Sequence, residues 1–507
     1  MEHTTHQQAS STVDVEKQPA VSVDADIGLQ FITQHGAITY NEEEERAVRW
    51  KLDLHLMPIL MITYGLQYLD KVTISYAAVY DMSSSLGLVG QQYAWATSIF
   101  YVGYLVGQPP SGYLLQKFPI GKFAATNLAL WGVMVTLCAV CENFADLAVL
   151  RFLMGVFESA IAPSWVHLTA MFYKKQEQAS RFTAWYFMVG AAVIAGGLLS
   201  YALGHTSATA VRPWQLIFLV CGGFTVLWSA VVLLRLPDDP LTARFLTPRQ
   251  RAVAVERLRG NRTGVKTARF KVPQAREALR DPQVWAFTLV TLVAQLVNVA
   301  GSFLPLIIRD AGFGARETTL LTLPTGGVEC VAMLAAGAAS LGFANGRTAI
   351  IFCVSLPTLA GCVLLAVVPR SETWARVVGS WMLLASPAGF AVMLSLIGSN
   401  VAGFSKKVTA STMVFVAYCV GNIVCPQLFV ASEAPEYGTA MRGMLSAMVI
   451  VLLLEVALGC YYVWENRRRD EVLANTPQEV VDAATLQNEE FLDRTDMEDF
   501  LKFRYRW

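Results

Sequence analysis

The stretch Gly65–Ala77 reads GLQYLDKVTISYA and places an acid, Asp70, directly before a base, Lys71. The apolar run around it extends from about residue 54 to residue 80, which is long enough for a helix to cross the roughly 30 Å hydrocarbon core of a bilayer. A charged side chain at that depth is costly unless it faces a cavity or finds a partner. The stretch therefore predicts a membrane-spanning helix in which the two charged residues have a structural or functional role.

Further apolar windows of similar length follow along the chain. Together with the first they lie near 54–80, 91–116, 120–141, 145–171, 182–204, 213–235, 283–308, 318–341, 347–368, 374–400, 408–431 and 439–464. Only helices or a closed barrel can satisfy the backbone inside a bilayer, and these uninterrupted runs lack the alternation of barrel strands. The composition agrees, because 54% of the 507 residues are hydrophobic and only 15% are charged. We predict an all-α membrane protein with 12 transmembrane helices.

A long polar interruption divides the windows into six and six. It contains the segment TPRQRAVAVERLRG, which resembles a basic amphipathic helix lying on the membrane surface. Two pseudo-symmetric six-helix bundles with a site between them are typical of transporters. The predicted divisions are an N-terminal tail (1–50), a first bundle (51–235), a central loop (236–282), a second bundle (283–465) and a C-terminal tail (466–507).

Basic residues in the short connections predict the orientation. They gather in the connections on the side of both termini, Lys406 and Lys407 among them, which predicts that both termini are cytosolic. The chain opens on a polar segment rather than on the pattern of a removable signal peptide. The net charge of zero gives no indication of a nucleic-acid partner, and no pattern indicates a metal site, a nucleotide-binding loop or a nucleophile with its base. We therefore expect neither an enzyme nor a cofactor.

Helical spacing groups the polar residues of the first window. One stripe, at i, i+3, i+7 and i+11, contains Tyr64, Gln67, Lys71 and Ser75, while Asp70 lies on the neighbouring face. In the fourth window Arg151, Gly155 and Glu158 share one face, and the glycine would let another helix approach closely. The charges could line a transport cavity, or they could be ion pairs that only fix the packing of the helices. An acid in such a cavity could carry a proton, and a fixed cation could attract an anion.

Several motifs resemble a known family. Residues 147–160, LAVLRFLMGVFESA, resemble the fourth-helix signature of the major facilitator superfamily, and LDK with the following SYA resembles the first helix of its anion:cation symporter family. The segments NVAGFSKK (400–407), GNIVCPQLF (421–429), APEYG (434–438) and NRRRD (466–470) resemble the fungal allantoate permease branch. The resemblance extends from about residue 49 to residue 470.

The resemblance implies a carrier that moves a small organic anion, such as a carboxylate, a vitamin or allantoate, together with protons by alternating access. Asp70 and Glu158 match positions that handle the coupling proton, and Arg151 matches an arginine that interacts with those acids. Lys71 stands where many members have an arginine that holds the anion. Lysine keeps the charge but loses the bidentate fork of arginine, so the substrate geometry could differ.

The inner-loop motif of the superfamily departs from its usual form. Gln116 and Leu341 stand where an acid is expected in the two halves, while Lys117 and Lys122 keep basic positions of the first copy. The contacts that latch the outward-facing state should therefore be replaced. Glu177 and Arg181, four residues apart after the fourth window, are the expected replacement.

The second half offers polar candidates for the substrate pocket. Gln295, Asn298 and Ser302 form a stripe on the seventh window, and Asn400, Asn422 and Gln427 lie on the tenth and eleventh. Hydrogen bonding that only joins the helices is the alternative. Trp165, His167 and Trp185 could line the pocket or only pack. Glu329 is ambiguous, and Glu455 is expected at a lipid-facing rim.

The favoured function is proton-coupled uptake of a small organic anion across a fungal plasma membrane, by a monomer. An exporter of a fungal secondary metabolite with the same fold is the second reading. A nutrient sensor is a more distant third, because a long signalling tail is missing from residues 466–507.

Overall fold

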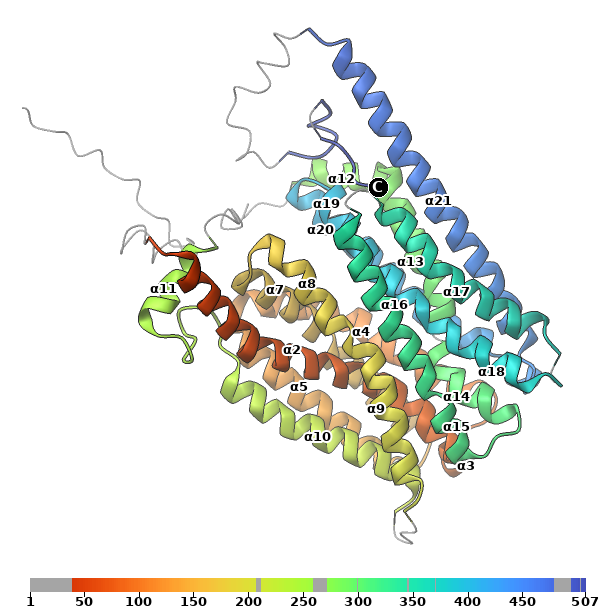
Figure 1. Cartoon of the computed structure of the whole chain (residues 1–507). Helices are drawn as coiled ribbons and strands as arrows, with labels where there is room; N and C mark the ends of the chain where they lie inside the picture. Colours follow the sequence, from red (N-terminus) through yellow and green to blue (C-terminus); the bar gives the residue numbers. More distant parts are fainter. Residues whose placement is uncertain are drawn as a thin grey trace, which may run out of the picture.

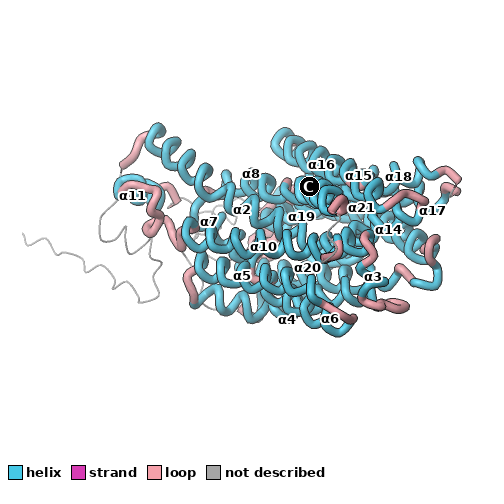
Figure 2. The backbone as a smooth tube through the Cα atoms, turned by 90° about the horizontal axis from the view of Figure 1, so that it is seen from below, coloured by secondary structure: helices cyan, strands magenta, loops and turns pink. Residues whose placement is uncertain are grey.

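The computed structural model describes residues 39–206, 211–258, 271–298, 300–343, 346–369, 371–477, 494–501 and 503–507. All the regular elements within these ranges are helices (Figure 2). Each of the predicted apolar windows coincides with one helix or with consecutive helices, so the fold class is confirmed. By length and composition, eight helices of the described chain could cross a membrane. The helices of the other four windows are outside these eight. They are α2 (Glu42–Val79), α4 (Gln92–Lys117), α6 (Phe144–Glu158) with α7 (Ile161–Phe172), and α13 (Pro282–Asn298) with α14 (Ala300–Asp310).

Besides α2, α6 and α7, the first half contains α3 (Met82–Ser85), α4 (Gln92–Lys117), α5 (Ile120–Leu137), α8 (Lys175–Tyr186), α9 (Met188–Leu203) and α10 (Pro213–Arg235). Within this half, α4 packs mainly against α6, α5 against α10, and α9 against α2. The central loop contains α11 (Pro248–Glu256) and α12 (Val272–Arg280).

The second half repeats the arrangement. Its helices are α13 (Pro282–Asn298), α14 (Ala300–Asp310), α15 (Ala315–Leu321), α16 (Leu323–Gly342), α17 (Arg347–Val367), α18 (Thr373–Met382), α19 (Ser386–Asn400), α20 (Phe404–Val424) and α21 (Gly438–Ala474).

The first helix begins earlier than its apolar window. The side-chain oxygen of Asn41 accepts a hydrogen bond from the Glu44 backbone N–H at 2.8 Å, and the Asn41 N–H donates to the Glu44 carboxylate. This capping box starts α2 at Glu42, inside the segment that we expected to be a tail. The acidic run Glu42–Glu45 thus forms the first turn of the helix, where the positive end of the helix dipole stabilises negative charge.

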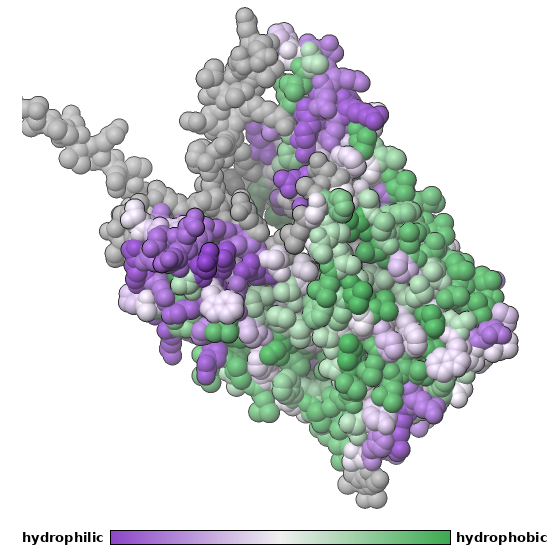
Figure 3. Space-filling model, viewed as in Figure 1, coloured by the Kyte–Doolittle hydropathy of each residue, from purple (hydrophilic) through white to green (hydrophobic). Residues whose placement is uncertain are grey.

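The apolar core has two parts. One cluster is built almost entirely from buried residues between 48 and 254, and the other from residues between 284 and 505. Figure 1 shows the corresponding halves, red to yellow-green and green to blue, packed against each other. Figure 3 shows a hydrophobic surface over the middle of both halves, with hydrophilic residues gathered toward the ends. A belt of this kind suits a bilayer, because exposed apolar surface is stable in lipid.

Two ends of the molecule are named here. The tail side carries the start of α2, together with α11, α12 and the last described residues, and the far side carries α3, α15 and the start of α18 (Figure 1). The domain boundaries and the location of the tail side in the cytosol stay predictions.

The last residues fold back onto the second half. Lys406, at the start of α20, is buried and contacts Asp281 and Asp496 at 2.7 Å each and Glu277 at 2.9 Å. Lys406, one of the basic residues from which the cytosolic side was predicted, is therefore enclosed by carboxylates. The contacts join α12, the start of α13 and the chain terminus, and we call these four residues with Arg469 and Tyr505 the C-terminal clasp.

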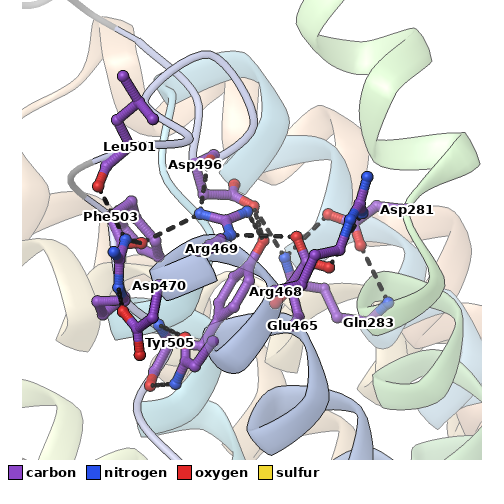
Figure 4. A network of polar contacts seen from close by, with 12 residues as sticks. Asp281, Gln283, Glu465, Arg468, Arg469, Asp470, Asp496, Leu501, Phe503 and Tyr505 are labelled. Atoms are coloured by element: carbon purple, nitrogen blue, oxygen red, sulfur yellow. Dashed lines mark hydrogen bonds and ion pairs between the residues drawn. The ribbon is translucent and has the colours of Figure 1, made fainter. Parts of the chain in front are cut away.

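Arg469 and Tyr505 complete the clasp (Figure 4). The Arg469 guanidinium donates to the Tyr505 hydroxyl at 2.9 Å, and this hydroxyl donates to the Asp496 carboxylate at 2.7 Å. Burial, with the negative charge of Asp496, raises the pKa of Tyr505 far above its ordinary range. The neutral hydroxyl is therefore favoured, which suits its role as the donor to Asp496.

Candidate functional site

The centre of the first half holds an ion pair between two helices. Lys71 Nζ of α2 lies 2.7 Å from Glu158 Oε1 at the end of α6. The Glu158 side chain is fully buried, while 16% of the Lys71 side chain is exposed. Gln67, one turn before Lys71, is buried and lies close to the same carboxylate. The structure therefore brings together three of the residues nominated from the first and fourth windows.

Asp70 and Arg151 lie beside this pair. Glu158, Arg151 and Lys71 are the charged groups around Asp70, which is buried. Neither Asp70 oxygen has a hydrogen-bond partner among the described residues within ordinary geometry. With all four groups ionised their charges sum to zero, and Lys71 with Glu158 is the ion pair formed directly among them in the described residues.

Arg151 also has a clear packing role. Its Nε donates to the backbone oxygen of Ala96 at 3.2 Å, and its guanidinium lies 5.0 Å from the centre of the Phe100 ring. Both partners belong to α4, so the arginine ties α6 to α4. The alternative of a structural arginine, left open by the sequence, is therefore supported by contacts, alongside its proximity to Asp70.

Glycines allow α4 and α6 to approach closely. A Cβ on Gly155 would lie 2.0 Å from the Phe100 backbone oxygen, and a Cβ on Gly103 would lie 2.0 Å from that of Phe152. No side chain fits at either position without moving a backbone. The expected role of Gly155 is confirmed, and it sets the position of Arg151 and Glu158 along the α4 surface.

Aromatic rings from both halves surround the ion pair. Lys71 Nζ lies 5.7 Å from the centre of the Tyr104 ring and 5.9 Å from that of Phe100. Tyr104 packs against Phe415 of α20 at 5.5 Å, and Tyr101 packs against Tyr418 at 6.1 Å. The lysine thus faces a wall to which the second half contributes.

The same wall continues toward α8. Tyr64 packs against Trp185 at 4.6 Å and against Tyr186 at 5.1 Å, which places the nominated Tyr64 and Trp185 together. Tyr101, Tyr104 and Tyr418 were not predicted from the sequence. Their signal was weak, since the spacing of Tyr101 and Tyr104 indicates one helix face without saying what that face meets.

Two nominated amides of the second half, Asn422 and Gln295, are hydrogen-bonded to each other. Asn422 Nδ2 donates to Gln295 Oε1 at 3.2 Å, which joins α20 to α13. This contact fits the alternative of hydrogen bonds between helices, although Asn422 Oδ1 has no hydrogen-bond partner within the described ranges. The side chains of Asn298 and Ser302 lie outside the described residues, so their expected place in the pocket stays a prediction.

Asn400 is not a pocket residue in this structure. Its side chain exchanges two hydrogen bonds with the backbone of Arg506, at 2.7 and 2.8 Å, on the tail side. Gln427 instead joins the halves, because its Nε2 donates to Ser98 Oγ of α4 at 2.9 Å.

The structure also shows the surroundings of Trp165, His167 and Glu455. Trp165 is buried and donates from its indole N–H to the Leu60 backbone oxygen at 3.2 Å, whereas His167 is exposed. Glu455, expected at the rim, is 94% buried and accepts a hydrogen bond from Ser355 of α17 at 3.1 Å. That expectation was wrong because α21 turns this position toward α17 rather than toward the lipid.

The expected latch takes a different form. Arg181 pairs with Asp53 of α2 at 2.6 Å rather than with the Glu177 carboxylate. Glu177 pairs with Arg257, which follows α11, and with Arg49 at 3.7 Å. The i, i+4 pair is therefore wrong, since each residue finds a partner on another element. The resulting contacts fasten α8 to α2 and to the central loop, all within the first half.

The two basic positions of the inner loop do not join this network. Lys117 is exposed and lies 4.5 Å from the centre of the Tyr113 ring, and Lys122 is exposed. The Gly121 backbone N–H instead donates to Asp238 at 2.9 Å. The gating role of these lysines stays a prediction.

The two halves are joined on the far side. The Arg309 guanidinium at the end of α14 donates to the backbone oxygens of Ala78 and Val79 and to the Asp81 carboxylate at 2.8–3.2 Å. Ser98 Oγ donates to the Ile423 backbone oxygen at 2.8 Å. On the tail side, the ion pairs of the described residues join parts of one half only.

Comparisons with known proteins agree with this architecture. The model of the Major Facilitator Superfamily matches residues 60–426. An uncharacterised transporter of Schizosaccharomyces pombe is 44% identical over 471 residues, covering 92% of this chain and 87% of that protein. Allantoate permease of Saccharomyces cerevisiae is 32% identical over 501 residues, covering 96% and 91% of the two chains.

A solved structure shows the same fold. The xylose transporter XylE of E. coli superimposes with a TM-score of 0.61 at 14% identity, covering 79% of this chain and 96% of that one. The family model and these relatives all describe transporters rather than enzymes. The chain is therefore an integral, multi-pass membrane transporter that belongs to the major facilitator superfamily, in the branch that includes fungal allantoate permease.

Proposed function

We propose that the protein carries a small organic anion together with protons, by alternating access. The observation that carries the proposal is the buried contact between Lys71 and Glu158 at 2.7 Å, in which the lysine keeps some exposure. Lys71 can serve either Glu158 or a substrate carboxylate. Glu158 and the substrate carboxylate thus compete for the same cation.

Competition of this kind couples the anion to a proton. When a substrate carboxylate takes the lysine, Glu158 is left as a buried carboxylate without its counter-charge. Such an ion is costly in a water-poor interior, so Glu158 takes up a proton from water. Asp70 provides a neighbouring acceptor among the same four charges. When the anion leaves, the proton leaves Glu158 and the ion pair forms again.

The surrounding rings suit a compact anion. The Tyr104 ring lies beside Lys71 and packs against Phe415 of the second half. Tyr101 packs against Tyr418 of the second half, and Tyr64 packs against Trp185. A substrate held there would contact both halves, as a rocking mechanism requires. One characterised relative is an allantoate permease, which supports testing ureido acids and other small carboxylates first.

The far-side contacts suggest which way this conformation opens. Arg309 and Ser98 hold the halves together at that end, so the proposed site opens to the tail side. With the basic connections on the tail side, we propose that it faces the cytosol of a fungal cell and that the protein resides in the plasma membrane as a monomer.

Reconstituted vesicles test the proposal. The probes are labelled allantoate, nicotinate and short carboxylic acids, each applied with and without an inwardly directed pH gradient. We expect one of them to accumulate against its gradient only when the pH gradient is present, and a proton ionophore to abolish the accumulation. Accumulation that does not depend on the pH gradient would contradict proton coupling. Accumulation driven by an outwardly directed proton gradient, as exchange of the substrate for protons requires, would favour an exporter.

A further inference from the structure

One buried carboxyl has no assigned role in the ion-pair exchange. Glu329 of α16 is 1% exposed, and neither of its oxygens has a hydrogen-bond partner in the described part of the chain. An ionised carboxylate in such a place is very unfavourable unless a positive charge compensates it. Its surroundings therefore decide which charge it takes.

Close packing limits what can reach Glu329 from α9. A Cβ on Gly190 would lie 2.6 Å from the Gly326 backbone oxygen, and a Cβ on Gly326 would lie 2.5 Å from that of Gly190. Cys330, beside Glu329, points its thiol toward the Phe187 backbone oxygen at 3.9 Å. This side of α16 is thus sealed by backbone contacts and offers no cation among the described residues.

The other helices packed on α16 use their charges elsewhere. On α8, Arg181 pairs with Asp53 and Glu177 pairs with Arg257. On α17, Arg347 donates to Ser395 and Ser399 of α19. On α18, Arg376 donates to backbone oxygens of α17 and its C-cap, and Glu317 caps α15. Arg316 lies near Tyr80, at the far side. The titratable groups facing Glu329 are Tyr68 of α2 and the adjacent Cys330, neither of which supplies a positive charge.

The charges of the first half do not compensate Glu329 either. Lys71 is paired with Glu158, and Arg151 lies beside Asp70, so two cations already face two carboxylates. Glu329 is a fifth charge-bearing group with no partner of its own. A bound proton balances it without requiring any other residue.

Its position links this proton to the motion of the two halves. Thr322 and Thr325 precede Glu329 by seven and four residues, on the same face of α16. Thr322 lines a small cavity, of about 10 Å³, with Tyr68 of α2 and Pro305 of α14. This volume is about that of one water-sized probe. The face that carries Glu329 is thus turned to the seam between the halves, which opens and closes during alternating access.

We propose that Glu329 is a second proton-binding site of the carrier, on the second half, and that its proton is bound in the closed seam and released to water when the seam opens. The step transfers a proton between water and the carboxyl oxygen and needs no other reactant. The contribution of Glu329 to transport rests on the proposed function, because the Glu329 proton is moved in addition to the proton bound by Glu158.

Infrared spectroscopy of the purified full-length protein tests the site without any substrate. We expect a carbonyl stretching band of a protonated carboxyl at neutral pH, shifted in heavy water, that disappears in Glu329→Gln and returns in Glu329→Asp. Glutamine resembles the protonated carboxyl in shape, so the variant should fold. The matched control is Glu436→Gln, an exposed position whose variant should keep the band. An unchanged band in Glu329→Gln would overturn the proposal.

Transport then separates this inference from the proposed function. In vesicles, we expect Glu329→Gln to keep exchange of internal for external substrate while its accumulation at a given pH gradient falls. A wild type that accumulates with the pH gradient and a Glu329→Gln variant with identical accumulation would defeat this inference alone. A wild type that ignores the pH gradient, yet shows the Glu329 band, would defeat the proposed function alone.

Discussion

At the scale of the residue, Lys71 has two competing kinds of partner. Glu158 holds it at 2.7 Å, and the aromatic faces of Phe100 and Tyr104 lie beside its ammonium group. An ammonium group is a compact point charge, so it can change partners with a small movement of its flexible stem. The proposed exchange of Glu158 for a substrate anion needs only such a movement.

The variant Lys71→Gln tests this competition. Removing the lysine leaves Glu158 buried and unpaired, which should lower the free energy of unfolding by about 3–5 kcal/mol and abolish anion binding. Thermal unfolding and binding of the labelled substrate measure the two effects.

The matched control is the double variant Lys71→Gln with Glu158→Gln, which removes both charges. It should regain most of the thermal stability while anion binding remains lost. Full substrate uptake by the single variant would refute the assignment of Lys71 as the anion contact.

At the scale of the element, the site depends on how closely α4 and α6 pack. Gly103 and Gly155 let the two backbones touch, and Arg151 reaches the Ala96 oxygen across the same contact. A separation of the helices would therefore move Arg151 and Glu158 together, since both are on the face of α6 that carries Gly155.

Gly155→Ala should disrupt this contact. The new Cβ would lie 2.0 Å from the Phe100 backbone oxygen, so we expect a loss of at least ~1–3 kcal/mol in stability and reduced transport. Gly223→Ala is the matched control, because no atom lies within 4 Å of its Cβ and alanine favours a helix by up to ~1 kcal/mol. Melting temperatures in detergent compare them, and equal temperatures for both variants would contradict the packing account.

The C-terminal clasp makes a second prediction at this scale. Lys406→Met removes the cation between Asp281, Asp496 and Glu277, so we expect a loss of ~3–5 kcal/mol and faster proteolysis of residues 494–507. Arg468→Gln is the control, since its side chain is 56% exposed and its substitution should change stability by less than ~0.5 kcal/mol. Equal proteolysis of the two variants would show that the clasp does not hold the terminus.

At the scale of the whole molecule, the halves are joined on the far side by Arg309, Ser98 and Gln427. Alternating access requires these contacts to break when the opposite side closes. Their strength is therefore expected to set the balance between the two conformations, because a population shifts only by the difference in free energy between states.

A reversible cross-link tests this requirement. Ser98 Oγ lies 2.9 Å from Gln427 Nε2, and because cysteine is shorter than glutamine, the variant Ser98→Cys with Gln427→Cys leaves a gap that a short bifunctional thiol reagent with a cleavable disulfide can bridge. We expect transport to stop on cross-linking and to return on reduction, while Ser98→Cys alone stays insensitive. Full transport by the cross-linked protein would contradict rocking about this contact.

The sequence predicted the helices and the charged residues better than it predicted their partners. Apolar length identifies a spanning helix, and helical spacing grouped Lys71 with Gln67 and placed Gly155 between Arg151 and Glu158. Partners across helices depend on the packing of distant segments, which no local pattern contains. Arg181 therefore bonds to Asp53 instead of Glu177. The site roles of these residues stay predictions.

The C-terminal clasp escaped prediction for the same reason. Lys406 looked like a surface residue that marks the cytosolic side, whereas three carboxylates from distant parts of the chain enclose it. Glu455 likewise pairs with Ser355 on a helix that is 100 residues away in the sequence.

The central claim is that anion binding at Lys71 makes Glu158 take up a proton. It is tested most directly by adding the identified substrate to purified protein in weakly buffered solution and following the pH with an indicator dye. The account predicts that protons are taken up as the anion binds, and that Glu158→Gln binds the anion without this uptake. Anion binding by the wild type with no change in pH, or an unchanged uptake in Glu158→Gln, would contradict it.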